Sequence, residues 1–404
     1  MKLSEYISPL LLDQNLVKSF SEMNGKWYEE TIHSESKLYT LILVPSELCN
    51  LHCKYCYETT KNSTHMDISL ARKLIKEYFE ILPIDNILKI ELRGGEPLLE
   101  FDFIKKICEW TFENYKSNNY YFYAVTNGTC FSSSDCRSWF FKYRDKIKLP
   151  LSIDGTKKTH NSNRDNSFEL IDIDFFLKTW KNAYTYTTVL PENSADIFEN
   201  LLFLTQKGFT VRANFEFAQT WTDDNIITCV QQLHKLADEI LKKRIKQRLN
   251  LFSCYGFIDF TENSDEDRQH MLNCNAGHRR FIYTPDGKKY PCHTLVPSAF
   301  NHYGVNNEVI FEKLYNDVLN PPDCCQCYYY YLCYICVGFS MSYANDYKWR
   351  NKSFCEITRI RTFLSAYYWG KKIENNIATK KLSDEEKYIA KKIYTLYKAE
   401  NLIE

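Results

Sequence analysis

The sequence predicts an α/β protein in which a parallel-sheet domain is followed by a smaller, cysteine-rich domain. From Leu38 onward apolar runs alternate with amphipathic stretches, and beyond residue 254 this alternation stops while cysteines accumulate. Strands separated by single helices indicate βαβ units, because parallel neighbours need a crossover connection. The strand-like runs are Leu38–Val44, Ile87–Leu92, Tyr120–Val125, Ile147–Ile153, Ala183–Leu190 and Phe209–Phe217. The helix-like stretches between them include Ile68–Ile81, Phe101–Tyr115, Phe168–Trp180, Ala195–Gly208 and Asp223–Arg248.

The length of 404 residues is enough for two or three domains. We predict an N-terminal extension at 1–37, the sheet domain at 38–254, the cysteine-rich domain at 255–370 and a helical tail at 371–404. A short strand is expected at Arg280–Thr284 in the cysteine-rich part. In the tail, the Ser-Asp-Glu-Glu run before an apolar stripe is typical of an N-capped amphipathic helix.

The charge and the cysteine content restrict the class of protein. Lysine plus arginine and aspartate plus glutamate both number 51, so the formal net charge is zero. Without a basic run, nucleic acid and anionic membranes are not expected partners. The first residues do not read as a secretory signal peptide, and no apolar run reaches membrane-spanning length. We therefore expect a cytoplasmic protein, in which 16 cysteines indicate metal ligation more than disulfides.

Cys49, Cys53 and Cys56 form the most informative motif of the chain. Three thiolates with intervals of three and two residues can hold one metal cluster and leave its last corner without a protein ligand. Four cysteines would build a closed electron-transfer cluster. Three cysteines leave one iron without a protein ligand, much as catalytic zinc sites keep one coordination position open. The spacing differs from the paired Cys-x-x-Cys of a zinc ribbon. The motif therefore indicates a cluster with an iron that is open to a ligand.

This cysteine motif, with the aromatic Tyr57 after its third cysteine, resembles the radical S-adenosylmethionine (radical SAM) superfamily. The resemblance implies a partial (β/α)6 TIM-like barrel and a [4Fe–4S] cluster whose open iron binds the amino and carboxyl groups of SAM. It implies that reductive cleavage of SAM releases a 5′-deoxyadenosyl radical, which abstracts hydrogen from substrate. It also implies a one-electron donor such as flavodoxin or ferredoxin.

Gly94, Gly95, Glu96 and Pro97 end the second predicted strand. Glycines let the backbone approach a ligand closely, and the glutamate can accept hydrogen bonds from ribose hydroxyls or an amino group. On its own, a turn of this kind is weak evidence for a ligand site. Here it lies one βα unit after the cysteine loop, and in that place it matches the motif that contacts the SAM amino group in the radical SAM family.

Polar residues also end the third and fourth predicted strands: Asn127 in Thr-Asn-Gly, and Ser152 and Asp154 in Ser-Ile-Asp-Gly, with Arg164 further on. The carboxyl ends of parallel strands face one mouth of the sheet, where ligands bind. Similar patterns occur in radical SAM enzymes that modify peptides. That resemblance implies that Ser152 and Arg164 contact the SAM ribose or carboxylate. Ordinary turn chemistry is the alternative for the Asn-Gly and Asp-Gly pairs.

The cysteines beyond residue 254 resemble a SPASM domain. Their order is Cys274, Cys292, the quartet Cys324, Cys327, Cys333 and Cys336, and the distant Cys355. The last interval of the quartet is two residues here, whereas the family pattern has three. The resemblance implies two auxiliary [4Fe–4S] clusters, one on Cys324, Cys327, Cys333 and Cys355 and the other on Cys274, Cys292 and Cys336. Structural zinc is the alternative, because thiolates suit zinc equally well.

The second of these clusters has three assigned ligands. Candidates for its fourth corner are Cys254, Cys325, His278 and His293, or a substrate thiolate. An iron-bound thiolate is deprotonated and can combine with a carbon radical. The sequence leaves these alternatives open.

His293 bears on the reaction itself. SPASM proteins mostly modify peptides or proteins, and those that mature sulfatases carry an aspartate directly after the cysteine that corresponds to Cys292. Here the run is Tyr-Pro-Cys-His, which resembles enzymes that join cysteine sulfur to a peptide carbon. We therefore predict a maturase of ribosomally made peptides that forms a cysteine thioether, with His293 as the candidate catalytic residue. The alternative for His293 is a hydrogen bond to backbone near the cluster.

Other functions stay open at this point. Within radical SAM chemistry they are carbon–carbon crosslinking, epimerisation and anaerobic sulfatase-type maturation. A non-enzymatic iron–sulfur electron carrier or redox sensor belongs to a different class, but it needs neither an open iron nor a SAM motif. A leader peptide, if one is bound, is expected to use residues 1–37, the C-terminal helix or a separate protein.

Overall fold

The structure is a computed structural model. It describes residues 38–83, 85–245, 249, 276–277, 279–299, 324, 336–344, 346, 348–375, 377, 384, 387–388, 390–391 and 394–395. The predicted extension 1–37 and three predicted cluster ligands, Cys274, Cys327 and Cys333, lie outside these residues.

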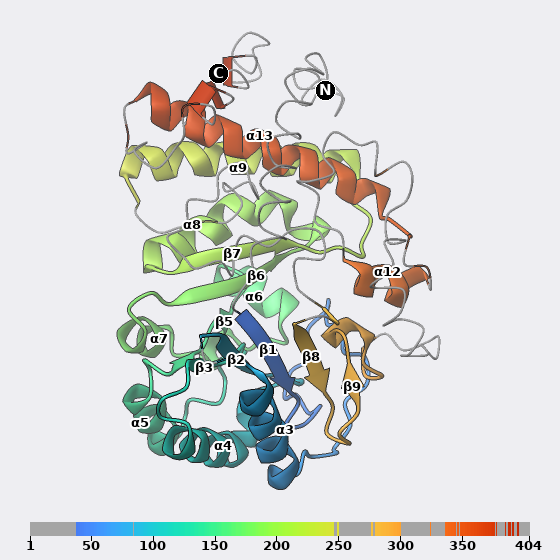
Figure 1. The fold of residues 1–404 in the computed structure, drawn as a ribbon. Helices are drawn as coiled ribbons and strands as arrows, with labels where there is room; N and C mark the ends of the chain where they lie inside the picture. The colour runs from blue at the N-terminus through green and yellow to red at the C-terminus, as the bar shows by residue number, and fades with distance from the viewer. Residues whose placement is uncertain are drawn as a thin grey trace.

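The described strands form two sheets that together make one curved, open barrel (Figure 1). The larger sheet has the order β4-β3-β2-β1-β8-β9 and the smaller one the order β5-β6-β7. All neighbours pair in parallel except β8 and β9, and a parallel bridge between Thr126 and Leu151 links the sheets. The predicted α/β fold is therefore confirmed. The strands are β1 (Leu38–Leu43), β2 (Ile87–Leu92), β3 (Tyr120–Ala124), β4 (Ile147–Lys148), β5 (Leu151–Ser152), β6 (Tyr184–Val189), β7 (Thr210–Phe215), β8 (Arg280–Tyr283) and β9 (Lys289–Tyr290).

Helices cover the outer face of the barrel (Figure 1). α3 packs on β1 and β2, α8 packs on β7, and α9 lies between α8 and α13. No described helix is long and apolar enough to cross a bilayer. The helices are α3 (Ile68–Ile81), α4 (Phe101–Asn114), α5 (Ser134–Lys142), α6 (Lys157–Asn163), α7 (Ile173–Thr179), α8 (Ile197–Lys207), α9 (Asp223–Lys243), α12 (Val337–Ala344) and α13 (Lys352–Glu374). Short 3₁₀ turns are η1 (Pro97–Glu100), η2 (Phe168–Leu170), η3 (Pro191–Asp196) and η6 (His293–Leu295).

The alternation of side chains along β2 shows how the barrel separates its core from its interior. Leu88, Ile90 and Leu92 are buried in the core cluster shared with α3 and α4. Successive residues of a strand point to opposite faces, so Lys89 and Glu91 face the barrel interior. The apolar face of the strand packs against the helices, and the polar face lines the interior of the barrel.

Two predicted elements are interrupted in the structure. The predicted strand Ile147–Ile153 is divided into β4 and β5 at Pro150, because proline lacks the N–H that a continuous ladder needs. The predicted helix Phe168–Trp180 is divided into η2 and α7. Asp172 caps α7, because its carboxylate accepts the backbone N–H of Phe175 at 3.0 Å.

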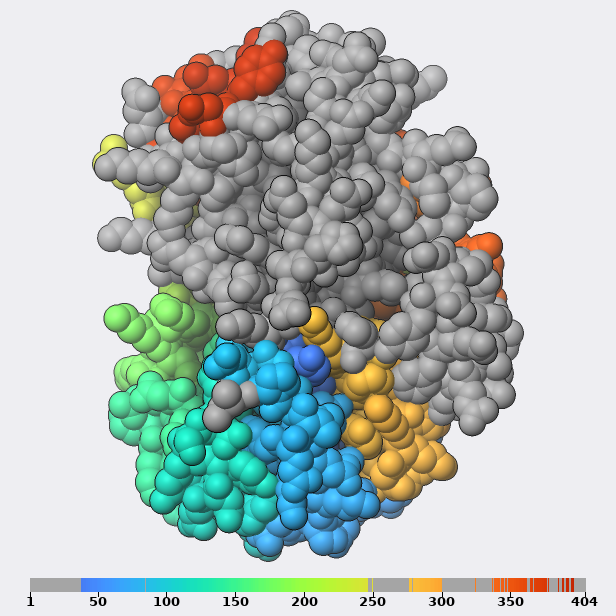
Figure 2. All heavy atoms as spheres, viewed as in Figure 1, coloured from blue at the N-terminus to red at the C-terminus, as the bar shows by residue number. Residues whose placement is uncertain are grey.

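The strand β8 joins the barrel beside β1, although it comes from the cysteine-rich half of the sequence. Its residues pair in parallel with β1, with Leu41 opposite Phe281, and Val44 donates its N–H to the carbonyl of Tyr283 at 3.0 Å. Figure 2 shows this segment in orange, directly against the blue segment that carries the first βα unit. The pairing brings the residues after β9 to the cysteine loop.

Candidate active site at the mouth of the barrel

The loop that carries Cys49, Cys53 and Cys56 leaves the carboxyl end of β1. All three thiols are partly buried and unbridged. Burial raises the pKa of Cys53 and raises that of Cys56 to about 11. These two thiols therefore hold their protons at neutral pH in the protein alone, and a metal that binds there has to displace these protons.

The Gly94–Pro97 turn presses against this loop. A Cβ atom on Gly94 would lie 2.0 Å from the carbonyl oxygen of Ser46, and one on Gly95 would lie 2.6 Å from the Cβ of Cys49. The φ angle of Gly94 is 143°, a value that side-chain-bearing residues rarely adopt. Glycine is thus required at both positions, because the turn and the cysteine loop leave no room for a side chain between them.

Glu96 is a buried acceptor at the centre of the site. Its carboxylate accepts the N–H of Leu98 at 3.0 Å, the hydroxyl of Thr126 at 2.8 Å and the N–H of Asn127 at 2.7 Å. Burial raises its pKa to about 7. An ionised carboxylate has about four acceptor positions, so a position remains on Oε2, the oxygen that faces Asn127. This geometry suits the predicted contact with the SAM amino group.

Asn127 ties the end of β3 to the cysteine loop. Its side-chain amide donates to Asn50 at 2.9 Å, and its carbonyl oxygen accepts the backbone N–H and the hydroxyl of Thr129 at 3.0 and 2.8 Å. Asn50 in turn donates to Thr129 at 2.8 Å. Since Asn50 directly follows Cys49, this network fixes the first cysteine against the strand end. Asn127 thus makes both the expected turn and a contact to the loop.

Asp154 and Arg164 form a buried ion pair, with 3.1 Å between the carboxylate and Nε. The carboxylate of Asp154 also accepts the hydroxyl of Tyr55 at 2.6 Å and the backbone N–H of Thr188 at 3.0 Å. Tyr55 stands inside the cysteine motif, and the Arg164 guanidinium lies 5.2 Å from the centre of its ring. Although burial opposes a charge, Asp154 holds the pKa of Arg164 above its ordinary value. Ser152 is buried beside them and donates its N–H to the carbonyl of Thr126 at 2.8 Å.

Sequence reasoning did not single out Tyr55. Its signal was its place in Cys53-Lys-Tyr55-Cys56, two residues before Tyr57. His160, on the short helix α6 that precedes Arg164, supports the ion pair. Its Nδ1 accepts the N–H of Asp154 at 3.3 Å and its Nε2 lies 3.0 Å from the Ser167 hydroxyl. Burial lowers the pKa of His160 to about 4, which keeps the ring neutral.

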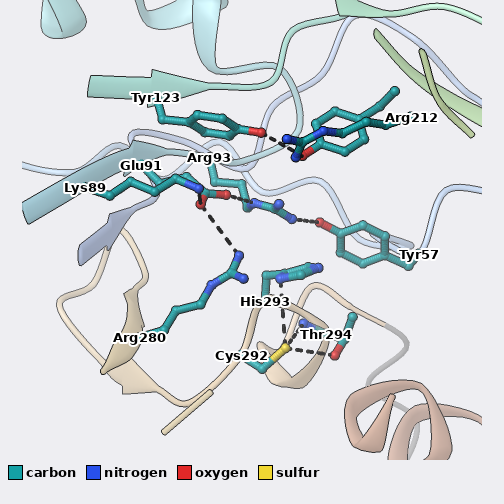
Figure 3. A network of polar contacts seen from close by, with 11 residues as sticks. Tyr57, Lys89, Glu91, Arg93, Tyr123, Arg212, Arg280, Cys292, His293 and Thr294 are labelled. Atoms are coloured by element: carbon teal, nitrogen blue, oxygen red, sulfur yellow. Dashed lines mark hydrogen bonds and ion pairs between the residues drawn. The ribbon is translucent and has the colours of Figure 1, made fainter. Parts of the chain in front are cut away.

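The segment of Cys292 lies beside Tyr57, the residue that directly follows Cys56 (Figure 3). The Cys292 sulfur is 3.2 Å from the Thr294 hydroxyl and 3.8 Å from Nδ1 of His293. A Cβ atom on Gly338 would lie 3.6 Å from that sulfur and 1.7 Å from the Thr294 hydroxyl. Gly338 follows Cys336 by two residues. The structure therefore brings Cys292 and Cys336, which were assigned to one cluster, into the same neighbourhood.

Cys355 lies on the first turn of α13, next to Phe354, whose ring centroid is 4.8 Å from that of Phe217. Cys324 is described and partly buried. The remaining ligands assigned to the same cluster, Cys327 and Cys333, lie outside the described residues.

A charged network joins the barrel interior to the Cys292 segment (Figure 3). The Glu91 carboxylate lies 2.7 Å from Arg93, 3.4 Å from Lys89 and 3.6 Å from Arg280. Burial disfavours its charge, but the three cations outweigh burial and hold its pKa well below the ordinary value. Burial, followed by the charges of Arg93 and Arg280, lowers the pKa of His293 well below its usual range.

Tyr57 faces this network. Its hydroxyl accepts a hydrogen bond from Arg93 at 3.1 Å, and its ring meets that of His293 edge-on, with centroids 5.3 Å apart. The position next to Cys56 therefore directs Tyr57 toward the Cys292 segment, while Tyr55 faces Asp154.

The residues at the cysteine loop fit an iron–sulfur cluster. The donors are three thiols on one loop, and the N–H of Leu51 points to the Cys49 sulfur at 3.5 Å. The glycine turn offers backbone without side chains beside Cys49. Among the described residues, no three His, Cys, Asp or Glu side chains lie close enough to hold a single metal ion. The fit to a cluster therefore rests on the three thiols of the loop and on the side-chain-free backbone of the glycine turn beside them.

Comparison with known proteins supports this interpretation. Residues 41–170 match a family model described as a 4Fe-4S single cluster domain. An uncharacterised protein of Methanocaldococcus jannaschii is 31% identical over 167 residues, which cover 40% of this chain and 56% of that protein. A cysteine-type anaerobic sulfatase-maturating enzyme of Clostridium novyi is 24% identical over 313 residues, which cover 69% of this chain and 79% of the enzyme. The chain thus spans little more than half the length of the first of these relatives.

The fold has a counterpart among solved structures. The structure titled native anSMEcpe with bound AdoMet and Cp18Cys peptide aligns with a TM-score of 0.64 and 20% identity, over 84% of this chain and 99% of that one. The fold and the cysteine loop are similar to those of radical SAM proteins of the SPASM type, in agreement with the prediction from the two sets of cysteines.

Proposed function

We propose that this chain is a radical SAM peptide maturase that joins a cysteine sulfur of a ribosomally made peptide to a carbon of that peptide. The observation that carries the proposal is the closeness of the two cysteine sites. Tyr57, next to Cys56, contacts His293, next to Cys292, with ring centroids 5.3 Å apart. A peptide at the barrel mouth is therefore within reach of both segments.

The residues have separate tasks in this proposal. Cys49, Cys53 and Cys56 hold the SAM-binding cluster, and Cys292 and Cys336 belong to an auxiliary cluster. When bound, SAM and its cluster supply the 5′-deoxyadenosyl radical that removes hydrogen from a substrate carbon.

Four side chains and two glycines form the SAM-binding site at the mouth of the barrel. Glu96 orients the amino group, and Ser152 with the Asp154–Arg164 pair lines the far side. Gly94 and Gly95 let the backbone approach. His293, whose Nδ1 lies 3.8 Å from the Cys292 sulfur, is neutral because its pKa is lowered, so it can take up the proton of the substrate thiol and pass it on to water.

The overall reaction balances without a further oxidant. One C–H and one S–H bond of the peptide break and one C–S bond forms. The carbon-bound hydrogen leaves in 5′-deoxyadenosine, SAM leaves as methionine, and the thiol proton passes to the base. The electron that starts SAM cleavage is recovered when the C–S bond forms, so one SAM is consumed for each bond.

Co-expression with a short, cysteine-containing reading frame beside the gene tests the proposal. The product peptide should lack two hydrogen atoms, and its cysteine should resist alkylation. Replacing the peptide cysteine by alanine should prevent the modification. If the alanine peptide is still dehydrogenated or epimerised, sulfur is not the partner, and carbon–carbon crosslinking or epimerisation replaces the thioether.

Sulfatase-type maturation is the second candidate, because the Clostridium novyi relative carries that name. At the position of His293 an aspartate is typical of that group, and this difference argues against sulfatase-type maturation. A synthetic peptide from a cysteine-type sulfatase distinguishes the two: oxidation of its cysteine by this protein would favour the second candidate.

A further inference from the structure

Tyr57 has contacts on both sides of the site. It directly follows Cys56, and its ring centroid lies 5.3 Å from that of His293 and 6.4 Å from that of Phe339. Both ring pairs are edge-on, a geometry that aromatic pairs favour. His293 follows Cys292, and Phe339 lies three residues beyond Cys336. One side chain of the cysteine loop thus touches the neighbours of two auxiliary cysteines.

Polar contacts fix the orientation of this ring (Figure 3). Arg93 donates to the Tyr57 hydroxyl at 3.1 Å, and its Nε donates to Glu91 at 2.7 Å. Glu91 is only 1% exposed, so this anchor is deeply buried. Arg93 also directly precedes Gly94, the first glycine of the turn that presses against the cysteine loop. The ring therefore cannot turn without disturbing the barrel interior.

We propose that Tyr57 is a positioning residue that couples the Cys292–His293 segment to the cysteine loop, so that a change beside Cys292 alters the reduction potential of the SAM-binding cluster. This inference rests on the proposed function only in taking Cys49, Cys53 and Cys56 as that cluster's ligands. It assigns to Tyr57 a task different from contact with SAM.

The physical basis is the sensitivity of a cluster to its surroundings. Hydrogen bonds to the sulfurs and exposure to solvent set the potential of an iron–sulfur cluster. Cys56 is partly buried and its sulfur lies 3.6 Å from the carbonyl oxygen of Glu58, so a shift of Tyr57 changes both factors at the adjacent residue. Reduction adds negative charge, which water stabilises. Loss of the ring should therefore admit water and raise the potential.

A double-mutant cycle on the potential tests the coupling. Iron-loaded wild type, Tyr57→Leu, His293→Ala and the double variant are titrated and followed by EPR, and the SAM-binding cluster is recognised by the change in its signal when SAM is added. We expect His293→Ala to change the reduction equilibrium about tenfold, or about 59 mV for one electron. In the Tyr57→Leu background the same substitution should have no effect.

Two further variants separate coupling from a general loss of packing. Tyr57→Phe keeps both ring contacts and loses only the Arg93 hydrogen bond that orients the ring, so its response to His293→Ala should be smaller than in the wild type but not abolished. Tyr115→Leu removes a stacked aromatic pair with Phe79 (4.2 Å) outside the site and should leave the potential unchanged. If Tyr57→Leu does not load iron, Tyr57→Met fills the space without a ring and takes its place in the cycle.

Additive effects of the two substitutions, or an unchanged potential in both single variants, would overturn the coupling. Failure of the proposed function is seen in a different measurement: the product peptide would lack the thioether, while the cluster signal of the wild type still responds to SAM. The cycle therefore decides on Tyr57 independently of the peptide product.

Discussion

Glu96 accepts the backbone N–H of Asn127 at 2.7 Å, so a buried carboxylate joins the ends of β2 and β3. The same carboxylate accepts the hydroxyl of Thr126 and the N–H of Leu98. Burial raises its pKa to about 7. The residue predicted to bind the SAM amino group is thus also a structural link, and substitutions at this position act on binding and on stability together.

Glu96→Gln should weaken SAM binding roughly ten- to a hundredfold, because a charge-assisted hydrogen bond contributes about 1.5–3 kcal/mol. It should also lower the free energy of unfolding by about 1–3 kcal/mol, since the amide that replaces Oε2 would face the N–H of Asn127. Isothermal titration with SAM and denaturant unfolding measure the two effects. Glu100→Gln, which disturbs only the partly exposed pair with His65, is the control; a SAM dissociation constant unchanged by Glu96→Gln would remove Glu96 from the pocket.

SAM affinity should rise with pH through about 7 in the wild type, because Glu96 ionises there and an ionised carboxylate accepts a stronger hydrogen bond from the SAM amino group. The pH dependence of the stability of the fold has the opposite sign. The folded-state pKa lies above the ordinary 4.5, so this group stabilises the fold fully below about pH 4.5, and the contribution is lost as the pH rises to about 7. Binding titrations at several pH values test this, and Glu96→Gln should abolish the slope. An equal slope in the variant would assign it to another group.

Asp154→Asn should destabilise the fold by about 3–5 kcal/mol, because it leaves the buried Arg164 without its counter-charge. Adding Arg164→Met should restore much of this loss in urea unfolding, while SAM binding stays impaired in both variants. Asp196→Asn, at the exposed pair with Lys158, should cost less than about 1 kcal/mol. Restoration of SAM binding by the double variant would show that the pair is only structural.

The sequence predicted those parts of the site that are formed by residues close to one another in the chain. The spacing of Cys49, Cys53 and Cys56 and the Gly94–Pro97 turn follow from what a cluster and a close backbone approach require. Contacts between distant positions were not predictable in this way. The Tyr55–Asp154 hydrogen bond joins residues 99 positions apart. The pairing of β8 with β1 likewise depends on how the barrel closes, and no short window of sequence records it.

Replacing Cys49, Cys53 and Cys56 together by alanine should abolish the formation of 5′-deoxyadenosine from SAM. The substitutions remove every protein ligand of the proposed cluster, while Cys292, Cys336 and Cys355 stay in place. Chromatography of the reaction with a chemical reductant measures the product. Full SAM cleavage by the triple variant would contradict the assignment of the loop. Cys108→Ala, at a fully buried thiol on the core-facing side of α4, is the matched control.

Iron content tests the auxiliary clusters. Three [4Fe–4S] clusters correspond to about twelve irons per chain, and the triple alanine variant should lose about four of them. Iron and sulfide assays on anaerobically reconstituted protein give the numbers. Cys292→Ala should lower the count while SAM still perturbs the remaining signal. Stoichiometric zinc in natively purified protein would instead favour a structural metal in the C-terminal half.

His293→Gln should separate SAM cleavage from peptide modification. Glutamine can still form hydrogen bonds but cannot take up a proton at neutral pH, and general base catalysis typically contributes about 10²–10⁴-fold. Formation of 5′-deoxyadenosine should therefore continue, while the crosslinked peptide falls by roughly that factor. Both are measured in one reaction by mass spectrometry. His65→Gln, at an exposed histidine paired with Glu100, should leave both products unchanged. If His293→Gln slows both products equally, His293 acts only through the cysteine loop and has no separate task at the substrate thiol.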